Sequence, residues 1–205
     1  MTSPQRPPRS AAVILAAGSS QRMGRPKQLL PVHGRAMLSL VIEQACASTV
    51  DEVVVVLGAH ADEVRASVDL GRARAVVNTD HAVGMSTSLR AAIDALADGV
   101  ARAVVLLGDQ PGITAGQIDE LLALQADSGL PVAAMSIDGL LQPPVVLDRS
   151  RWEELRRLQG DTGLREVLRS HPEHVATLTP SADAQPADID TPDDYRRLLE
   201  LGMRR

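Results

Sequence analysis

Short apolar runs alternate along this chain with segments of helical periodicity, and this alternation constrains the fold more than any other feature. Strands are predicted over residues 11–17, 52–58, 73–78 and 102–108. Helices are predicted over residues 36–48, 60–68, 86–97 and 114–127. Parallel strands need crossover connections of this length, so four strand–helix repeats predict an α/β fold with a mostly parallel, doubly wound, Rossmann-like sheet.

The second half of the chain follows the same alternation less regularly. Further strands are predicted over residues 131–137, 143–148 and 174–178. Helices are predicted near residues 150–158 and 163–169, with a last one from Thr191. Because no repeat or linker divides the sequence, we expect a single domain over residues 11–201, after a disordered lead-in over residues 1–10.

Composition excludes several classes of function. The chain has 205 residues and a net charge of -5, and Trp152 and Tyr195 are its aromatic residues. An acidic chain with so few rings lacks both the basic surface and the stacking platforms of nucleic-acid binding. No apolar run approaches the length of a membrane span, and the N-terminus has no signal-peptide core. Cys46 stands alone, which fits a reducing cytoplasm.

Positive charge gathers around the first predicted strand. Residues 1–42 hold six Lys or Arg and no acid, whereas the rest of the chain holds 15 Lys or Arg against 26 Asp or Glu. The stretch "LAAGSSQRMGRPKQLLP" at 15–31 then combines small residues with cations. Its backbone N–H groups could approach an anion that Arg22 and Lys27 neutralise. A glycine turn whose cations face water explains the residue types equally well.

Two acidic stretches follow further along. In "VVLLGDQP" (104–111), Asp109 is the first acid after a strand, where a carboxylate suits Mg²⁺ beside phosphate oxygens. A plain turn aspartate before Pro111 is the alternative. In "ADIDTPDDY" (187–195), Thr191 and Asp194 predict a capping box. Asp188 and Asp190 precede that cap and, two residues apart, would share one face and complete a metal site.

Taken together, these stretches resemble the molybdenum cofactor nucleotidyltransferase-like family, the MobA-like NTP transferases. "VVNTDHAVGMSTSL" and "GDTGLREVL" also fall in that family's order, and the resemblance covers about residues 11–201. "LAAG" rather than "LAGG" is more similar to molybdenum cofactor cytidylyltransferases than to the guanylyl branch. The resemblance implies a sheet of the nucleotidyltransferase type.

The resemblance also implies roles for particular residues. Nucleotide binding falls to Ala16, Ala17, Gly18, Arg22, Lys27, Asn78, Gly84 and Ser88, the last three near the base. Catalysis falls to Arg22, Lys27 and Asp109. Mg²⁺ binding falls to Asp109 and Asp190. Asp161 and Arg165 would face the acceptor, although helix N-capping by Asp161 and a solvated arginine are equally good explanations.

The implied reaction transfers CMP from CTP to a phosphorylated acceptor, a molybdopterin-type molybdenum cofactor, and releases pyrophosphate. A molybdoenzyme or its chaperone would then be the partner, with no nucleic acid and no membrane involved. Two alternatives remain: a nucleotidyltransferase for a sugar phosphate or another small phosphorylated acceptor, and a non-catalytic relative that binds nucleotide or cofactor. One departure concerns the acceptor, because Leu141, Gln142 and Pro143 replace polar or cationic residues of the family.

Overall fold

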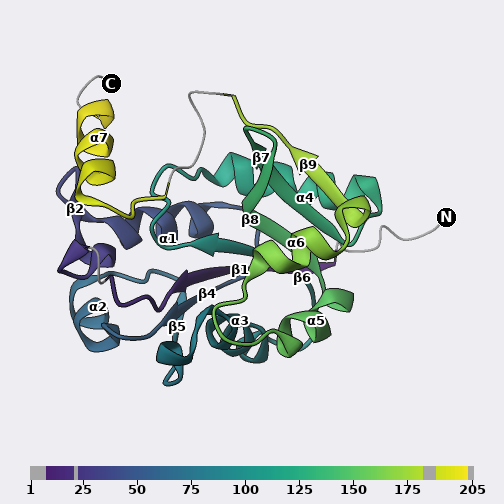
Figure 1. Cartoon of the computed structure of the whole chain (residues 1–205), viewed down its shortest axis with the longest axis horizontal. Coiled ribbons are helices and arrows are strands. Elements are labelled where there is room, and N and C mark those ends of the chain that lie inside the picture. Colours follow the sequence, from purple (N-terminus) through teal and green to yellow (C-terminus); the bar gives the residue numbers. More distant parts are fainter. Residues whose placement is uncertain (1–7, 21–22, 182–187, 203–205) are drawn as a thin grey trace.

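The computed structural model describes residues 8–20, 23–181 and 188–202 and is built around one twisted sheet (Figure 1). Within these residues seven strands form the sheet in the order β5-β4-β1-β6-β8-β7-β9. The strands are β1 (Arg9–Ala16), β4 (Glu52–Leu57), β5 (Arg74–Val77), β6 (Val100–Leu107), β7 (Val132–Ile137), β8 (Leu140–Asp148) and β9 (Val175–Leu178). The predicted α/β class and the mostly parallel sheet are confirmed.

The central strands are parallel, and their register is continuous from Ser10 of β1 onward, after a shift against β6 between Arg9 and Ser10. Val13 of β1 lies beside Val54 of β4 on one side and Val105 of β6 on the other. Among the described strands, β8 runs antiparallel to both of its neighbours, β6 and β7. The β5-β4-β1-β6 half has the connectivity of a doubly wound fold, in which the strand order reverses between the first strand and its neighbour β6.

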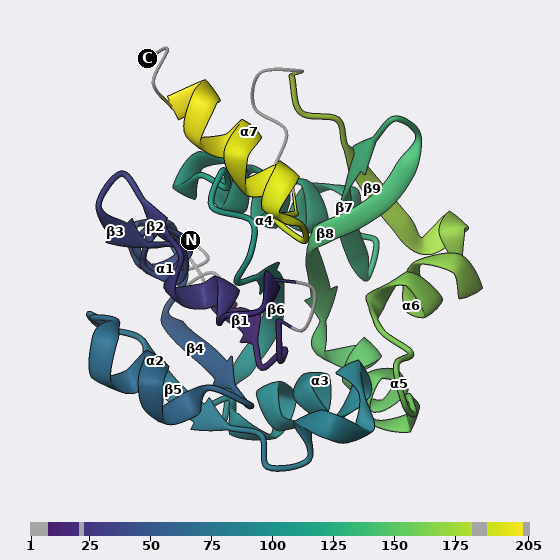
Figure 2. The same cartoon turned by 60° about the vertical axis from the view of Figure 1, so that its left-hand side comes forward.

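Helices cover both faces of the sheet (Figures 1 and 2). Alternate residues of β1 face opposite sides, so Ala12 and Ile14 join one hydrophobic cluster and Ala11 and Val13 the other. The first cluster takes side chains from α1 (Met37–Ala47), α2 (Ala61–Ser67) and α4 (Ala115–Ser128). The second takes side chains from α3 (Met85–Ala95), α5 (Trp152–Arg157) and α6 (Leu164–Ser170).

A third, smaller cluster attaches the last helix, α7 (Pro192–Gly202), to the start of the chain. Tyr195 packs on this cluster and its hydroxyl donates to the Pro31 carbonyl, beside the small hairpin of β2 (Pro31–Val32) and β3 (Arg35–Ala36). The predicted capping box is present, since the Asp194 backbone N–H donates to Thr191 Oγ1 and the Thr191 N–H donates to Asp194 Oδ2. The C-terminal segment is thereby held against the N-terminal one.

The boundaries of two strands differ from those predicted. β1 begins at Arg9, inside the predicted lead-in, and residues 1–7 lie outside the described part of the chain. β8 begins at Leu140 rather than at residue 143, because Asp138 and Gly139 form a tight hairpin turn with φ of 52° and 76°. That Asp-Gly pair is a hairpin signal. The predicted strand includes the prolines at 143 and 144 but leaves out the three residues before them.

No helix among the described residues is long and apolar enough to cross a membrane.

A substitution at Gly58 would test how tightly the chain is packed at the end of β1. An added Cβ would lie 2.5 Å from the Ala17 carbonyl oxygen, which is a clash with backbone. We expect Gly58→Ala to lower the free energy of unfolding by about 1–3 kcal/mol, as overpacking does. Gly116→Ala, within α4, is the matched control, because its Cβ would lie 4.0 Å from Thr114 Oγ1, an ordinary van der Waals distance. It should raise stability by about 0.5 kcal/mol. Equal midpoints for Gly58→Ala and the parent in urea denaturation would contradict this packing argument.

Candidate active site

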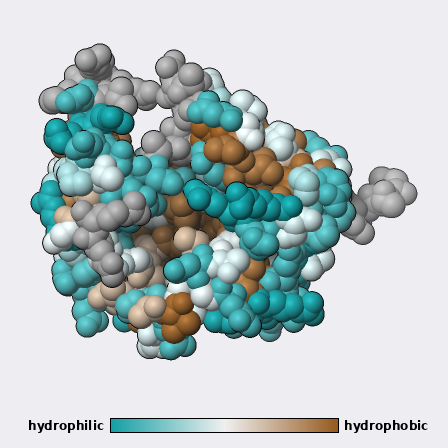
Figure 3. Space-filling view, in the orientation of Figure 1, coloured by the Kyte–Doolittle hydropathy of each residue, from teal (hydrophilic) through white to brown (hydrophobic). Residues whose placement is uncertain are grey.

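A cavity of about 940 Å³ opens where β1 and β6 end, at the point where the strand order reverses. Figure 3 shows the hollow near the middle of this face, with apolar residues on its floor. Its lining includes most of the residues singled out in the sequence: Ala16, Ala17, Gly18, Lys27, Gly84, Ser88, Asp109, Asp161, Arg165 and Asp190. Arg22 lies outside the described residues.

The glycine loop continues β1 into this cavity. A Cβ at Gly18 would meet no protein atom within 4 Å, so the space beside this backbone is open. Gln28, which the sequence analysis did not single out, is 3% exposed, and its Nε2 donates to the carbonyls of Ala16 and Gly18 at 3.0 Å each. Gln28 thus holds the loop, and both the loop and Gln28 line the cavity.

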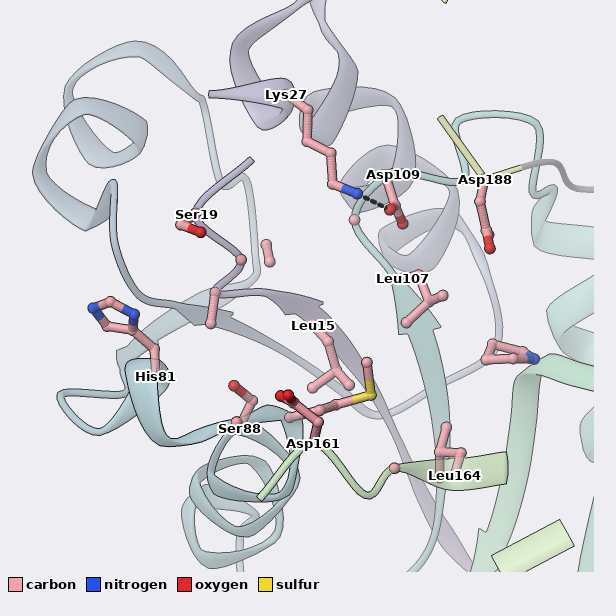
Figure 4. A pocket seen from close by; sticks show the side chains of 18 of the residues that line it. Leu15, Ser19, Lys27, His81, Ser88, Leu107, Asp109, Asp161, Leu164 and Asp188 are labelled. Carbon is pink, nitrogen blue, oxygen red and sulfur yellow. Dashed lines mark hydrogen bonds and ion pairs between the residues drawn. The ribbon is translucent and has the colours of Figure 1, made fainter. Parts of the chain in front are cut away.

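The Lys27 Nζ contacts two carboxylates, those of Asp109 and Asp190, and Figure 4 shows the contact with Asp109. Its Nζ donates to Asp109 Oδ2, in a short contact, and to Asp190 Oδ1 at 3.0 Å. Burial lowers the pKa of Lys27, but the charges and hydrogen bonds of Asp109 and Asp190 outweigh it and hold that pKa above its ordinary value. The ammonium group is therefore charged, and its single positive charge offsets part of the negative charge of the two predicted metal-binding residues.

Asp188 and Asp190 have different partners, although both line the cavity. Asp188 Oδ1 accepts from Gln110 Nε2 at 2.7 Å, and Gln110 is 2% exposed. Burial, and next the charge of Asp109, raise the pKa of Asp188 above its ordinary value. The sequence paired Asp188 with Asp190 but gave no sign that Gln110 would hold it, because Gln110 is distant along the chain.

Asn78 is the described member of the predicted set that does not line the cavity. It is 5% exposed, and its Nδ2 donates to Thr87 Oγ1 at 2.8 Å and to Ser88 Oγ at 3.0 Å. Its side-chain oxygen accepts from the Asp80 N–H. Asn78 therefore orients the first turn of α3, and Ser88 is the group of this set that faces the cavity.

Gly84 has a local structural requirement. Its φ is 135°, and a Cβ there would lie 2.2 Å from the Gly160 carbonyl carbon. The segment containing Gly160 and Asp161 consequently packs directly on the start of α3. Asp161 does not cap α6, because the N-cap of that helix is Gly163 and no side chain bonds to it. Figure 4 shows Asp161 beside Ser88 at the cavity.

Gln142 and Pro143 also line the cavity. The Gln110 Nε2 that holds Asp188 is 3.4 Å from the Pro143 carbonyl as well, so β8 and the C-terminal segment meet at this side chain. Two of the three residues at the departure from the family pattern, Gln142 and Pro143, therefore lie on the cavity wall, while Leu141 packs against the second hydrophobic cluster.

Asp109, Asp188 and Asp190 all line the cavity, and Mg²⁺ and Mn²⁺ prefer carboxylate oxygens as ligands. The oxygens of these three residues do not lie close enough together to form a ready-made metal cluster. Among the described residues, the group that meets this condition is His171, Glu173 and His174, which does not line the cavity. Lys27, a cation, already contacts the carboxylates of Asp109 and Asp190. Its position shows that this part of the cavity accommodates positive charge.

A parallel sheet with an open glycine loop and facing carboxylates at its reversal point defines a nucleotide-binding α/β domain of the nucleotidyltransferase type. Residues 12–175 match the model of the MobA-like NTP transferase domain, and the chain belongs to that family. The resemblance found in the sequence motifs is confirmed.

Several relatives share nearly the whole chain. Nicotine blue oxidoreductase of Paenarthrobacter nicotinovorans is 36% identical over 91% of this chain and 95% of its own length. Purine catabolism protein PucB of Bacillus subtilis is 32% identical over 93% and 96%, respectively. The crystal structure of Rv0371c from Mycobacterium tuberculosis in complex with manganese is 31% identical, with a TM-score of 0.81, over 94% of this chain and 98% of that one.

The Lys27 contacts predict how a substitution of Lys27 changes the affinity for a divalent metal. Lys27→Met removes a cation from between Asp109 and Asp190, so Mn²⁺ should bind the nucleotide-free protein roughly tenfold more tightly or better, given the size of one nearby charge. Titration followed by electron paramagnetic resonance measures this affinity. Arg35→Met, which removes an exposed ion pair with Glu43, is the control. Unchanged or weaker Mn²⁺ binding in Lys27→Met would contradict the assignment of these carboxylates to a metal.

Proposed function

We propose that this protein transfers CMP from CTP to a phosphorylated acceptor of the molybdopterin type, releases pyrophosphate, and works in the cytoplasm with Mg²⁺. The observation that carries the proposal is the meeting of Lys27 with Asp109 and Asp190 beside an open glycine loop. A triphosphate lying along that loop would place its charge next to a lysine and to carboxylates able to hold a metal.

This nucleotidyl transfer requires positioning of the two reactants and neutralisation of their charge, and it needs no covalent enzyme intermediate. An acceptor phosphate oxygen attacks the α-phosphorus of CTP in line, and the bond to pyrophosphate breaks. Gly18 lets the backbone approach the phosphates, and Arg22 and Lys27 neutralise the charge that moves onto the leaving group. Mg²⁺ held by Asp109 and Asp190 would supply further neutralisation at the phosphate oxygens.

At the end of the cavity that would hold the nucleotide base, we propose that backbone and hydroxyl groups recognise the base in place of aromatic side chains. Gly84 and Ser88 line the cavity there, and Asn78 fixes the Ser88 hydroxyl. At the acceptor end, we propose Asp161 and Arg165, together with Gln142. A molybdoenzyme or its chaperone would receive the product. A sugar phosphate acceptor and a non-catalytic binding role are the competing proposals.

Choice of nucleotide is the first test. Because the loop reads Leu15-Ala16-Ala17-Gly18, we expect CTP with Mg²⁺ to raise the melting temperature more than GTP, UTP or ATP at equal concentration. Pyrophosphate release on adding molybdenum cofactor, but not a sugar phosphate, would then support the acceptor. Stabilisation by GTP at least as large as by CTP would contradict the cytidylyl assignment.

The same preparation should be assayed for reduction of nicotine blue, since a relative that covers nearly the whole chain is named for such an activity. Nicotine blue reduction without nucleotide-dependent pyrophosphate release would overturn the proposal in favour of an oxidoreductase.

Removal of a proposed metal ligand is the second test. Asp109→Ala should lower kcat by about 100-fold, as loss of one preorganised electrostatic group does. The matched control is Asp127→Ala, an exposed carboxylate on α4 that does not line the cavity. The control should retain normal turnover. Near-normal turnover in Asp109→Ala at saturating Mg²⁺ would remove Asp109 from the site.

A further inference from the structure

The side chain of Gln28 makes three hydrogen bonds to the glycine loop, and Gln28 also lines the cavity. It lies in η2 (Lys27–Leu29), directly after Lys27, and its side chain is buried. Both of the carbonyls that it binds, those of Ala16 and Gly18, belong to the strand end and loop that face the cavity. Its two amide hydrogens are therefore fully used on the backbone of one loop.

The other end of the same amide connects the loop to Lys27. Ser20 Oγ donates to Gln28 Oε1 at 3.3 Å and accepts from the backbone N–H of Lys27 at 3.0 Å. Ser20 itself has φ of 54°, the left-handed conformation that a residue with a side chain rarely adopts. Gln28 and Ser20 thus hold the loop and the start of η2 in one hydrogen-bonded network.

We propose that Gln28 is the positioning residue of the nucleotide loop: it fixes the backbone of residues 16–20 relative to Lys27, so that loop and lysine meet the same triphosphate. The inference rests on the proposed function for its ligand. Gln28 acts through the loop backbone and through Ser20, because its amide groups are already bonded to protein.

The chemistry of this position requires an amide of this length. Glutamate would direct negative charge at the two carbonyl oxygens in place of two donors. Methionine fills a similar volume but leaves both carbonyls without their donor, which is costly for a buried polar group. Asparagine is one methylene shorter and cannot span the same three partners.

The experiment compares Gln28→Met with Gln125→Met. Gln125 is also a buried glutamine whose Nε2 donates to a backbone carbonyl, that of Leu130 at 2.9 Å, but it lies away from the cavity. Amide hydrogen exchange is measured on the nucleotide-free proteins, and CTP·Mg²⁺ binding and steady-state kinetics follow. The exchange measurement does not depend on any nucleotide activity.

We expect Gln28→Met to speed exchange at the Lys27 amide and within residues 18–20 at least about tenfold, with β1 residues 12–15 unchanged. KM for CTP should rise roughly tenfold or more, as expected for two lost hydrogen bonds. The Gln125→Met protein should match the parent in both readouts. Unchanged exchange in the loop, or faster exchange with unaltered CTP binding, would overturn the inference.

Ser20→Ala keeps the test decisive if Gln28→Met folds poorly. It removes the other half of the network with little loss of packing, and it should speed exchange at the Lys27 amide in the same direction. A double-mutant cycle of the two changes should be clearly non-additive, because they break one network. Additive effects would overturn the inference. Absence of CTP binding in the parent protein would instead count against the proposed function, while the exchange data still decide the role of Gln28.

Discussion

The contact of Lys27 with Asp109 and Asp190 is the interaction on which the arrangement of the site depends. It joins the segment after β1, the end of β6 and the segment before α7, which lie far apart in sequence. Two carboxylates this close repel one another, and the partly buried ammonium group offsets that repulsion. A backbone hydrogen bond joins two of the same segments, since the Ile189 N–H donates to the Asp109 carbonyl at 3.1 Å.

Sheet topology explains why these groups meet. Parallel strands direct their carboxyl ends to one edge, and the order reverses between β1 and β6, which leaves room for a ligand there. The ends of β1 and β6 remain hydrogen-bonded up to this point, since the Gly108 N–H, just before Asp109, donates to the Leu15 carbonyl at 2.9 Å. The third hydrophobic cluster, through Met37 and Ile189, holds the C-terminal segment against this edge.

The sequence predicted the strand–helix order because burial on both faces leaves uninterrupted apolar strands such as residues 11–17. It also pointed to Asp109, since a strand's carboxyl end is a definite place in a parallel sheet. It could not reveal Gln28 or Gln110, whose partners are backbone carbonyls or a carboxylate that only tertiary packing brings near. The antiparallel direction of β8 was not predicted either, because it depends on which strands pair in the folded sheet.

Under the proposed function, Lys27 has to exchange partners when nucleotide arrives. Its ammonium group now contacts both Asp109 and Asp190, while a triphosphate and a divalent metal together offer new partners to the lysine and to the carboxylates. The lysine and the two carboxylates can therefore each keep a contact with opposite charge during the exchange, which avoids the cost of an unpaired buried ion. A backbone held by Gln28 suits this exchange, since only the flexible Lys27 side chain then has to move.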